Sequence, residues 1–224
     1  TFTSYQLGRS SILELLAAEF TARGQEALAV PCNVGDKAAA QSLVDTVMNK
    51  WGRIDSLVCN AASNPYYGPN EKLPDEVFLK IMQNNILSNM WLINLCLPDM
   101  RKKKDGSIQI VSSIGGLRAS TVIGAYCISK AADMQLARNL ACEYGEHNIR
   151  VNCIAPGLIK TDFARALWEN PQIRAAQEGK AALKRIGEPD DIGGVAVFLA
   201  SKAGNFVCGQ TIIADGGVIG MGAE

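Results

Sequence analysis

The sequence has few of the residues on which hydrolases and zinc enzymes depend. Its 224 residues include a single histidine, His147. A serine–histidine–aspartate triad would have to use that residue, and a histidine-based metal site would have only one imidazole. The surrounding stretch EYGEHNIRVN predicts a surface loop between a helix and a strand. Hydrolytic and zinc chemistry are therefore disfavoured, and we expect no metal site.

The sequence also lacks an excess of either charge and a long apolar run. Its formal net charge is zero, which gives no field to attract nucleic acid or an anionic membrane. No run approaches the ~18 consecutive apolar residues of a membrane span. Neither end shows a signal peptide, a peroxisomal signal or a lipidation signal. We expect a cytoplasmic protein without nucleic-acid or membrane partners.

The seven cysteines form no C-x-x-C pair, and their odd number does not suggest a disulfide framework. They are scattered through apolar segments, which is typical of buried, reduced thiols. Cys127 stands out because it adjoins Tyr126.

Apolar periodicity predicts a regular alternation of helices and strands. The expected helices cover 10–24, 36–52, 75–104 with a polar interruption at 83–85, 124–145 and a segment that begins near Pro189. The expected strands are 26–34, 54–62, 106–113, 148–157 and 209–217, and 158–187 is irregular. Alternation with strands buried on both faces implies one α/β domain over 1–224, built on a doubly wound parallel sheet.

Polar residues and turn formers recur where three of these strands end. The strand-exit tetrads are CNAA, IVSS and IAPG, which hold Asn60, Ser112, Ser113, Pro156 and Gly157. Each alone is explained equally well as a turn former. Ligands of open parallel sheets bind beyond the carboxyl ends of the strands, so the recurrence favours a site at this edge.

A serine, a tyrosine and a lysine stand at a specific spacing in SSIGGLRASTVIGAYCISKAA: Ser113, then Tyr126 thirteen residues later, then Lys130. Tyrosine and lysine four apart occur on many helices, but this spacing is specific. With CNAA, RVNCIAPGLIKT and the C-terminal third from RIGEPDD to IIADGG, it resembles the short-chain dehydrogenase/reductase family over essentially the whole chain. The resemblance implies a Rossmann-like fold.

The three residue types allow proton transfer to a carbonyl. Free tyrosine, with a pKa of about 10, is a poor acid or base at neutral pH. Residues four apart on a helix are neighbours, so we expect the Lys130 ammonium to lower the pKa of Tyr126. Ser113 can donate a hydrogen bond to a carbonyl oxygen on which negative charge builds.

The resemblance implies an NAD(P)-dependent oxidoreductase. Hydride passes between nicotinamide C4 and the substrate carbon while Tyr126 transfers the proton. Lys130 also holds the nicotinamide ribose, and Asn85, in MQNNILS, completes the catalytic set by holding a water relay, with Asn84 as the alternative. The resemblance also implies a homotetramer formed through the two long helices and the C-terminal strand region.

Further cofactor contacts are implied by position in the family pattern. They are Asn33 and Val34 near the adenine, and Asn60, Ala61, Pro156, Gly157, Ile159 and Thr161 at the strand ends. Arg9 stands where the family places a basic residue for the 2′-phosphate, which favours NADP over NAD.

One departure concerns the start of the chain. The family's first strand and its T-G-x-x-x-G-x-G turn, whose amides hold the diphosphate, have no counterpart in TFTSYQLGRSSILELL. We expect residues to be missing from this sequence between about Leu7 and Ser10, and an intact mass of 24.0 kDa would contradict that.

Apolar residues suggest the substrate class. The segment 158–187 is where the family builds a lid over the substrate. Candidate apolar walls of the substrate site are Phe163, Leu167 and Trp168 in this segment, and Tyr66 and Tyr67 outside it. A role in packing explains each of them equally well. They favour a hydrophobic or aromatic carbonyl. NAASNP and APGLIKTDFARALW look most like an NADP-dependent subgroup that reduces carbonyls, including retinal and aromatic ketones. The alternatives are a 3-oxoacyl reductase and a catalytically weak binding protein on the same scaffold.

Overall fold

A four-stranded parallel sheet forms the centre of the computed structural model, which describes residues 10–221. Its order is β1 (Ser56–Cys59), β2 (Gly106–Val111), β3 (Ile149–Pro156) and β4 (Thr211–Ala214). The register pairs Cys59 with Ile110, and Ile110 with Cys153. All four strands therefore end at one edge of the sheet, as the sequence predicts.

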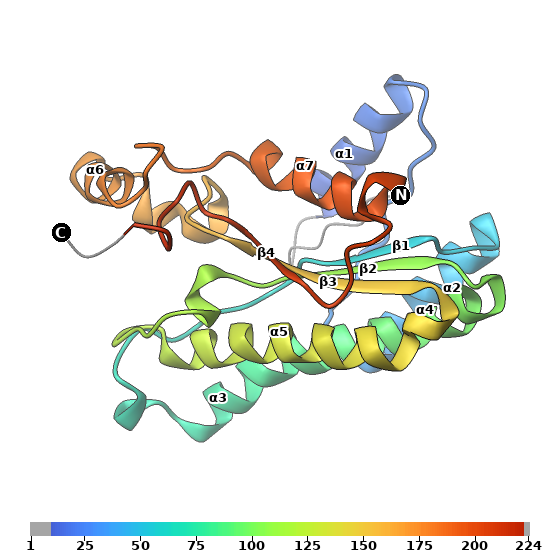
Figure 1. Cartoon of the computed structure of the whole chain (residues 1–224), viewed down its shortest axis with the longest axis horizontal. Helices are drawn as coiled ribbons and strands as arrows, with labels where there is room; N and C mark the ends of the chain where they lie inside the picture. Colours follow the sequence, from blue (N-terminus) through green and yellow to red (C-terminus); the bar gives the residue numbers. More distant parts are fainter. Residues whose placement is uncertain (1–9, 222–224) are drawn as a thin grey trace.

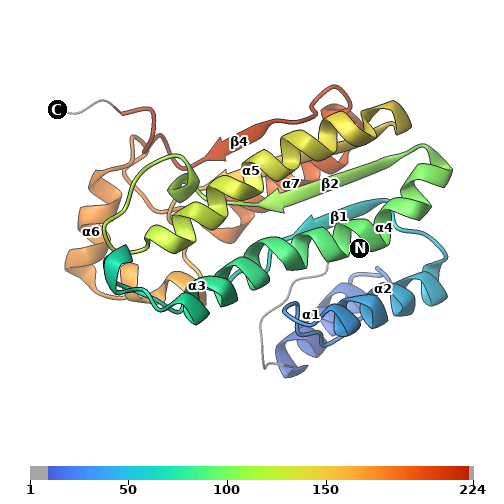
Figure 2. The same ribbon diagram turned by 90° about the horizontal axis from the view of Figure 1, so that it is seen from below.

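Helices cover both faces of the sheet (Figures 1 and 2). α4 (Ser88–Lys103) and α5 (Gly124–Tyr144) lie on one face, with α2 (Lys37–Trp51) packed against α4. α7 (Pro189–Ala200) packs on the other face, on the side where Figure 1 places α1 (Ser10–Ala22). The remaining elements are α3 (Asp75–Met82), η1 (Asn70–Lys72), η2 (Gln83–Leu87), η3 (Ile114–Gly116), η4 (Gly145–His147), η5 (Asp162–Leu167), α6 (Pro171–Gly179) and η6 (Lys202–Gly204).

The predicted ends of α2 are confirmed by its capping groups. The Asp36 carboxylate accepts from Ala38 N at 2.8 Å, which satisfies a backbone donor that has no partner within the helix. Gly52, with φ of 69°, ends the helix in the left-handed conformation that glycine adopts without a steric cost. Short polar residues and glycine thus fix the length of this helix.

The main core lies between the sheet and the α4–α5 face. β2 and β3 are buried along almost their whole length, which matches their nearly continuous apolar sequence. Ile93 and Met100 of α4 and Ile108 and Val151 of the sheet are fully buried. A smaller cluster joins Ile154 to Leu199 of α7 on the opposite face. This packing holds the carboxyl edge of the sheet between α5 and α7.

The prediction of a strand over 26–34 is wrong. These residues have no strand conformation, although Val30 and Cys32 pack against the core. Among the described residues β1 pairs only with β2, so the segment has no neighbouring strand with which to exchange backbone hydrogen bonds. An apolar run alone does not form a strand without such a partner.

The predicted interruption of the long helix is confirmed and has a defined form. Gln83–Leu87 make one turn of π-helix between α3 and α4, and the N–H of Ser88 bonds to the carbonyl of Gln83. Single π turns are frequent at functional sites because they rotate side chains out of the regular helical register. This turn carries Asn84 and Asn85, both of which are buried.

Candidate active site

The first two turns of α5 carry Tyr126 and Lys130 to the end of β2. The Lys130 side chain is 2% exposed, and its Nζ donates to Val111 O at 2.8 Å. Ser112 Oγ donates to Lys130 O at 2.6 Å, so the serine anchors the helix to the strand end. The predicted neighbours therefore lie against the exit of β2.

Gly116 allows η3, which follows Ser113, to lie directly on α5. A Cβ at this position would lie 2.6 Å from the backbone carbonyl carbon of Lys130 and 2.7 Å from Ala131 N. Both contacts are closer than a methylene group tolerates, and backbone atoms cannot move aside cheaply. The glycine therefore allows the Ser113 segment to approach the helix that carries Tyr126.

The structure corrects the expected pKa direction of Tyr126. Burial raises the pKa of the Tyr126 phenol above its ordinary value, and this effect outweighs the lowering by Lys130 and by a side-chain hydrogen bond with Ser113. Lys130 Nζ lies 5.6 Å from the centroid of the Tyr126 ring, and Asp133 adds to the rise. The interacting partners are those predicted, but desolvation of the phenolate dominates.

Asn85 is fixed by the π turn in a closed hydrogen-bonding environment. Its Oδ1 accepts from Ser63 N at 2.8 Å, and its Nδ2 donates to Ser63 O at 3.1 Å and to Ser129 Oγ at 3.0 Å. Ser129 Oγ in turn donates to Tyr126 O at 2.7 Å. The asparagine thus connects the strand exit after β1 with the helix that carries Tyr126.

Asn84 occupies a different environment. Its Nδ2 donates to Ser63 Oγ at 3.0 Å, whereas its buried Oδ1 has no hydrogen-bond partner among the described residues. Only Asn85 of the two bonds to a side chain of α5, which favours Asn85 as the asparagine of the site.

Sequence reasoning missed two further members of this cluster. Asp133 is fully buried, and its Oδ2 lies 3.1 Å from Lys130 Nζ. Asn89 Nδ2 donates to Asp133 Oδ1 at 3.1 Å and to Asn85 O at 2.7 Å. An acidic residue three positions after Lys130, in an otherwise apolar stretch of helix, was the available signal.

The expected cofactor contacts after β1 and β3 lie at the edge where the strands end. Asn60 is exposed and Ala61 half-buried directly after β1. After β3, Gly157 N donates to Ala214 O at 3.0 Å, Ile159 bridges to Gly187, and Thr161 Oγ1 donates to Ile159 O at 3.4 Å. Pro156 pairs with Ala214 in the sheet.

The residues expected to contact the adenine end of the cofactor, Asn33 and Val34, make contacts within the protein itself. Asn33 is exposed and its Oδ1 accepts from Gly35 N at 3.1 Å, which stabilises the turn before α2. Val34 is 6% exposed and faces the protein interior. Arg9 and the Leu7 side of the expected gap lie outside the described residues.

The side chains present fit the nicotinamide-ribose half of a dinucleotide. An ammonium has three donors, and Val111 O and Asp133 take two of those of Lys130, which leaves one for a ribose hydroxyl. No T-G-x-x-x-G-x-G turn for the diphosphate occurs in the 224 residues. These side chains therefore match the requirements of one half of the cofactor.

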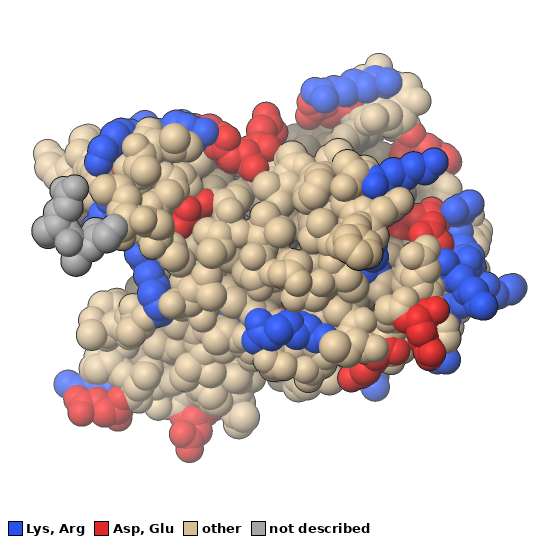
Figure 3. All heavy atoms as spheres, viewed as in Figure 1, with Lys and Arg blue, Asp and Glu red and all other residues tan. Residues whose placement is uncertain are grey.

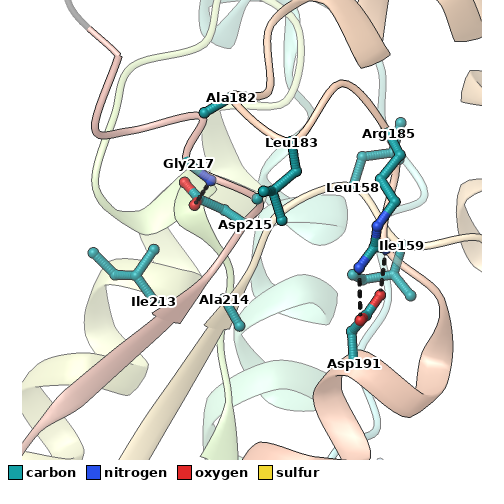
Figure 4. Close-up of a pocket in the computed structure, with 12 residues that line it drawn as sticks. Leu158, Ile159, Ala182, Leu183, Arg185, Asp191, Ile213, Ala214, Asp215 and Gly217 are labelled. Atoms are coloured by element: carbon teal, nitrogen blue, oxygen red, sulfur yellow. Dashed lines mark hydrogen bonds and ion pairs between the residues drawn. The ribbon is translucent and has the colours of Figure 1, made fainter.

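A cavity of about 450 Å³ opens beside the exit of β3 (Figure 4). Arg185 and Asp191 form an ion pair at 2.6 Å on one side of it, and Asp215 accepts from Gly217 N on the other. Ile159 is the one expected site residue among those that line it. The cavity thus adjoins the expected cofactor segment and does not contain the Tyr126 phenol.

The segment 158–187 contains η5 and α6 within irregular chain, as expected. The Phe163 ring lies 6.2 Å from the Tyr126 ring, centroid to centroid, and Phe163 and Leu167 are exposed. Trp168 Nε1 donates to Thr161 O at 2.8 Å, so this indole also packs the segment together. Tyr66 donates to Pro69 O at 2.9 Å, and Tyr67 is exposed.

All seven cysteines are free thiols, but the expectation of burial holds only for Cys59, Cys96 and Cys153. Cys142 of α5 is exposed, and the other three cysteines are half-buried. His147 lies between α5 and β3, as predicted, but this connection is the short helical turn η4 and the side chain is half-buried beside Glu146. Within the described residues, no group of three or more His, Cys, Asp or Glu is arranged to hold a metal ion.

Comparison with known proteins agrees with this geometry. The family model described as Enoyl-(Acyl carrier protein) reductase matches residues 6–219. "Dehydrogenase/reductase SDR family member 4" of Bos taurus is 39% identical over 83% of this chain and 67% of its own length.

Solved structures share the fold. A 7α-hydroxysteroid dehydrogenase complexed with NADH and 7-oxo glycochenodeoxycholic acid has a TM-score of 0.89 at 32% identity, covering 93% of this chain and 81% of its own. A gluconate 5-dehydrogenase from Burkholderia cenocepacia, in complex with NADP and tartrate, has a TM-score of 0.85 at 25% identity over 93% and 81%.

The parallel sheet, the residues at its carboxyl edge and these relatives define an NAD(P)-dependent oxidoreductase that acts on an alcohol/carbonyl pair. The chain belongs to the short-chain dehydrogenase/reductase family.

Proposed function

We propose that Tyr126 is the acid/base of this oxidoreductase and that Ser113, Lys130 and Asn85 complete its catalytic set. The observation that carries the proposal is their convergence at the exit of β2. Lys130 and Tyr126 come from α5, Ser113 from the strand end, and Asn85 from the π turn, joined through Ser129.

Each side chain has a role that follows from its contacts. The substrate carbonyl oxygen accepts hydrogen bonds from Ser113 Oγ and the Tyr126 phenol, and Tyr126 passes its proton to that oxygen in reduction. Lys130 holds a ribose hydroxyl with its third N–H and favours the phenolate that remains. Asn85 fixes the start of α5 through Ser129. The nicotinamide, when bound, supplies or accepts the hydride.

We further propose that the substrate is a hydrophobic or aromatic carbonyl. Phe163 lies next to Tyr126, is 49% exposed and belongs to the segment proposed as a lid, 158–187. An aromatic ring beside the acid/base gives an apolar wall and no group to bind a phosphate. The 7α-hydroxysteroid dehydrogenase among the related structures is complexed with 7-oxo glycochenodeoxycholic acid, a ketone on a hydrophobic steroid ring system, which is consistent with that choice.

NADP is the cofactor that we favour, on the position of Arg9 alone; the related structures contain NADH in one case and NADP in another. The remaining contacts proposed for it are Asn33, Val34, Asn60, Ala61, Pro156, Gly157, Ile159 and Thr161.

We also propose a cytoplasmic homotetramer whose contacts use the long helices, α3–α4 and α5, and the C-terminal strand region. Met90 of α4 and Ile128 of α5 are 38% and 46% exposed.

Acidic and basic side chains are interspersed on the face shown in Figure 3, without a field of one sign that would favour nucleic acid. Among the described residues no helix has the length and apolarity to cross a membrane.

The test has two stages. Fluorescence titration with NADPH and with NADH measures whether and which cofactor binds. A panel of aromatic ketones, retinal, steroid ketones and 3-oxoacyl thioesters then measures turnover with the cofactor that binds. We expect the apolar ketones to have the highest kcat/KM. Preference for the thioesters would favour the 3-oxoacyl reductase alternative, and absence of binding at millimolar cofactor would favour the binding-protein alternative.

A further inference from the structure

Asp133 is a carboxylate buried directly behind the proposed catalytic lysine. Its side chain is fully inaccessible to solvent, its Oδ2 is 3.1 Å from Lys130 Nζ, and its Oδ1 accepts from Asn89 Nδ2 at 3.1 Å. The Lys130 side chain is 2% exposed, so water does not screen this pair. A buried ion pair of this kind is weak evidence for a role in stability, because burying two charges costs about as much as their attraction returns.

The position of the pair points to the reaction. Lys130 Nζ lies 3.1 Å from Asp133 Oδ2 and 5.6 Å from the centroid of the Tyr126 ring, so the lysine contacts both groups. Asn89 continues the chain of hydrogen bonds from Asp133 to the carbonyl of Asn85. The proposed catalytic groups Tyr126, Lys130 and Asn85 are thus connected through Asp133 and Asn89.

We propose that Asp133 is a positioning residue of this oxidoreductase: its carboxylate holds the Lys130 ammonium in place and offsets part of its charge, so that Tyr126 experiences less than a full positive charge. This inference rests on the proposed role of Tyr126. It assigns to Asp133 control over how readily the phenol gives up its proton.

The surroundings of Asp133 contain few other charges. Lys130 and Tyr126 face it from α5, Asn89 from α4, Cys59 from β1 and Cys153 from β3. Burial raises the pKa of the Cys153 thiol to about 12 and that of Cys59 further, so both thiols are neutral near pH 7. Asn89 does not titrate. The charged groups of this cluster that act on the Tyr126 phenol are therefore Asp133 and Lys130.

The electrostatic directions agree with this assignment. Lys130 lowers the pKa of Tyr126 and Asp133 raises it. Burial raises the pKa of Asp133 itself above its ordinary value, against the lowering by Lys130 and Asn89. When the carboxylate is removed, the whole charge of Lys130 acts on the phenol, and the phenolate becomes easier to form.

The experiment is a titration of the Tyr126 phenol that needs neither substrate nor cofactor. Protein labelled with ¹³C at tyrosine Cζ is followed by NMR against pH, and Tyr126→Phe assigns the signal. Asp133→Asn keeps the size and the acceptor for Asn89 but removes the charge. We expect its Tyr126 signal to begin to titrate at lower pH than in the wild type. Asp105→Asn, which removes the same charge from an exposed turn before β2, serves as the matched control and should leave the titration unchanged.

A second variant covers the case in which Asp133→Asn does not fold. Asn89→Ala removes the hydrogen bond that fixes the Asp133 carboxylate in place. With the carboxylate less closely held against Lys130, more of the charge of Lys130 acts on the phenol, and the same signal should shift in the same direction by a smaller amount. An unchanged Tyr126 titration in a folded variant of either kind overturns the proposal. If the titration shifts but the wild type reduces no carbonyl and binds no nucleotide, the coupling stands and the proposed function fails.

Discussion

Asn85 Nδ2 donates a hydrogen bond to Ser129 Oγ across the interface between the π turn and α5, at 3.0 Å. The same amide bonds to both backbone groups of Ser63, so one side chain joins the exit of β1 to the helix of Tyr126. The asparagine has no exposed surface. Asn84 makes no bond to α5, so substitutions of the two neighbouring asparagines should have different effects.

Asn85→Ala should destabilise the fold by about 1–3 kcal/mol, because it removes three hydrogen bonds of a fully buried side chain and leaves part-buried backbone groups of Ser63 without their partner. It should also lower kcat, because the start of α5 loses its anchor. Urea unfolding and steady-state kinetics measure the two effects. Asn84→Ala is the matched control: it removes one hydrogen bond and one unpaired acceptor, so both effects should be smaller. Equal losses of kcat in the two variants would contradict the assignment to Asn85.

Ser113→Ala should reduce kcat by roughly 10²- to 10³-fold, the usual result of removing one donor to a developing oxyanion. Cofactor affinity should change little, since the proposed contact of Ser113 is with the substrate oxygen. Ser112→Ala removes a hydroxyl that bonds to Lys130 O, and it should lower Tm with a smaller loss of kcat. The two variants therefore distinguish an effect on the reaction from an effect on the attachment of α5 to the end of β2. A wild-type kcat in Ser113→Ala would exclude Ser113 as a donor to the substrate oxygen.

The two reaction directions should depend on pH in opposite ways. The neutral Tyr126 phenol donates the proton in carbonyl reduction and is present below its pKa, which burial raises. Reduction should therefore be level through neutral pH and fall only under alkaline conditions. Alcohol oxidation needs the phenolate and should rise as pH increases. Rate–pH profiles in both directions measure this, and a reduction rate that increases from pH 6 to pH 8 would be incompatible with Tyr126 as the acid.

The Arg185–Asp191 pair predicts a local dependence of stability on pH. A hydrogen bond from Arg185, with one from the Glu188 backbone, lowers the pKa of Asp191 to about 2. A carboxylate with a lowered pKa contributes stability above its unfolded pKa of about 3.9, and this contribution is lost as pH falls towards 2. Asp191→Ala should therefore have a lower Tm than the wild type at pH 7, and the gap should close below about pH 4.

Asp190→Ala, one residue earlier in the same helical turn, is the control for that measurement. It removes an acidic side chain from the first turn of α7 but not the Arg185 pair, and its Tm should fall less. A Tm gap for Asp191→Ala that stays constant from pH 7 to pH 3 would contradict the assigned linkage.

The sequence predicts most of the fold because its signals are local. Asp36 and Gly52 mark the ends of α2, and the apolar runs of β2 and β3 identify strands buried on both faces. The strand expected at 26–34 has the same kind of local signal, yet pairing depends on a neighbour that local sequence does not reveal. Long-range pairing is therefore where prediction from this sequence failed.

The site was predictable in part for a similar reason. The spacing of Ser113, Tyr126 and Lys130 identifies the proposed catalytic residues, but their electrostatics depend on burial and on residues from other elements. The rise in the pKa of Tyr126 comes first from desolvation, and the pairing of Lys130 with Asp133 is visible only when the helix face that points inward is known. The spacing of residues in the sequence thus predicts which residues form the site, and the packing of the fold determines how their charges affect the pKa of Tyr126.

The most direct test of the central claim compares Tyr126→Phe with Tyr144→Phe, a change to the other tyrosine of α5, near its C-terminal end. Hydride transfer from the reduced cofactor that binds is measured with the best carbonyl of the panel, and cofactor binding is measured alongside. Tyr126→Phe should lower kcat by at least about 10²- to 10⁴-fold with cofactor affinity retained, while Tyr144→Phe keeps near wild-type turnover. Turnover by Tyr126→Phe at the wild-type rate would contradict the account.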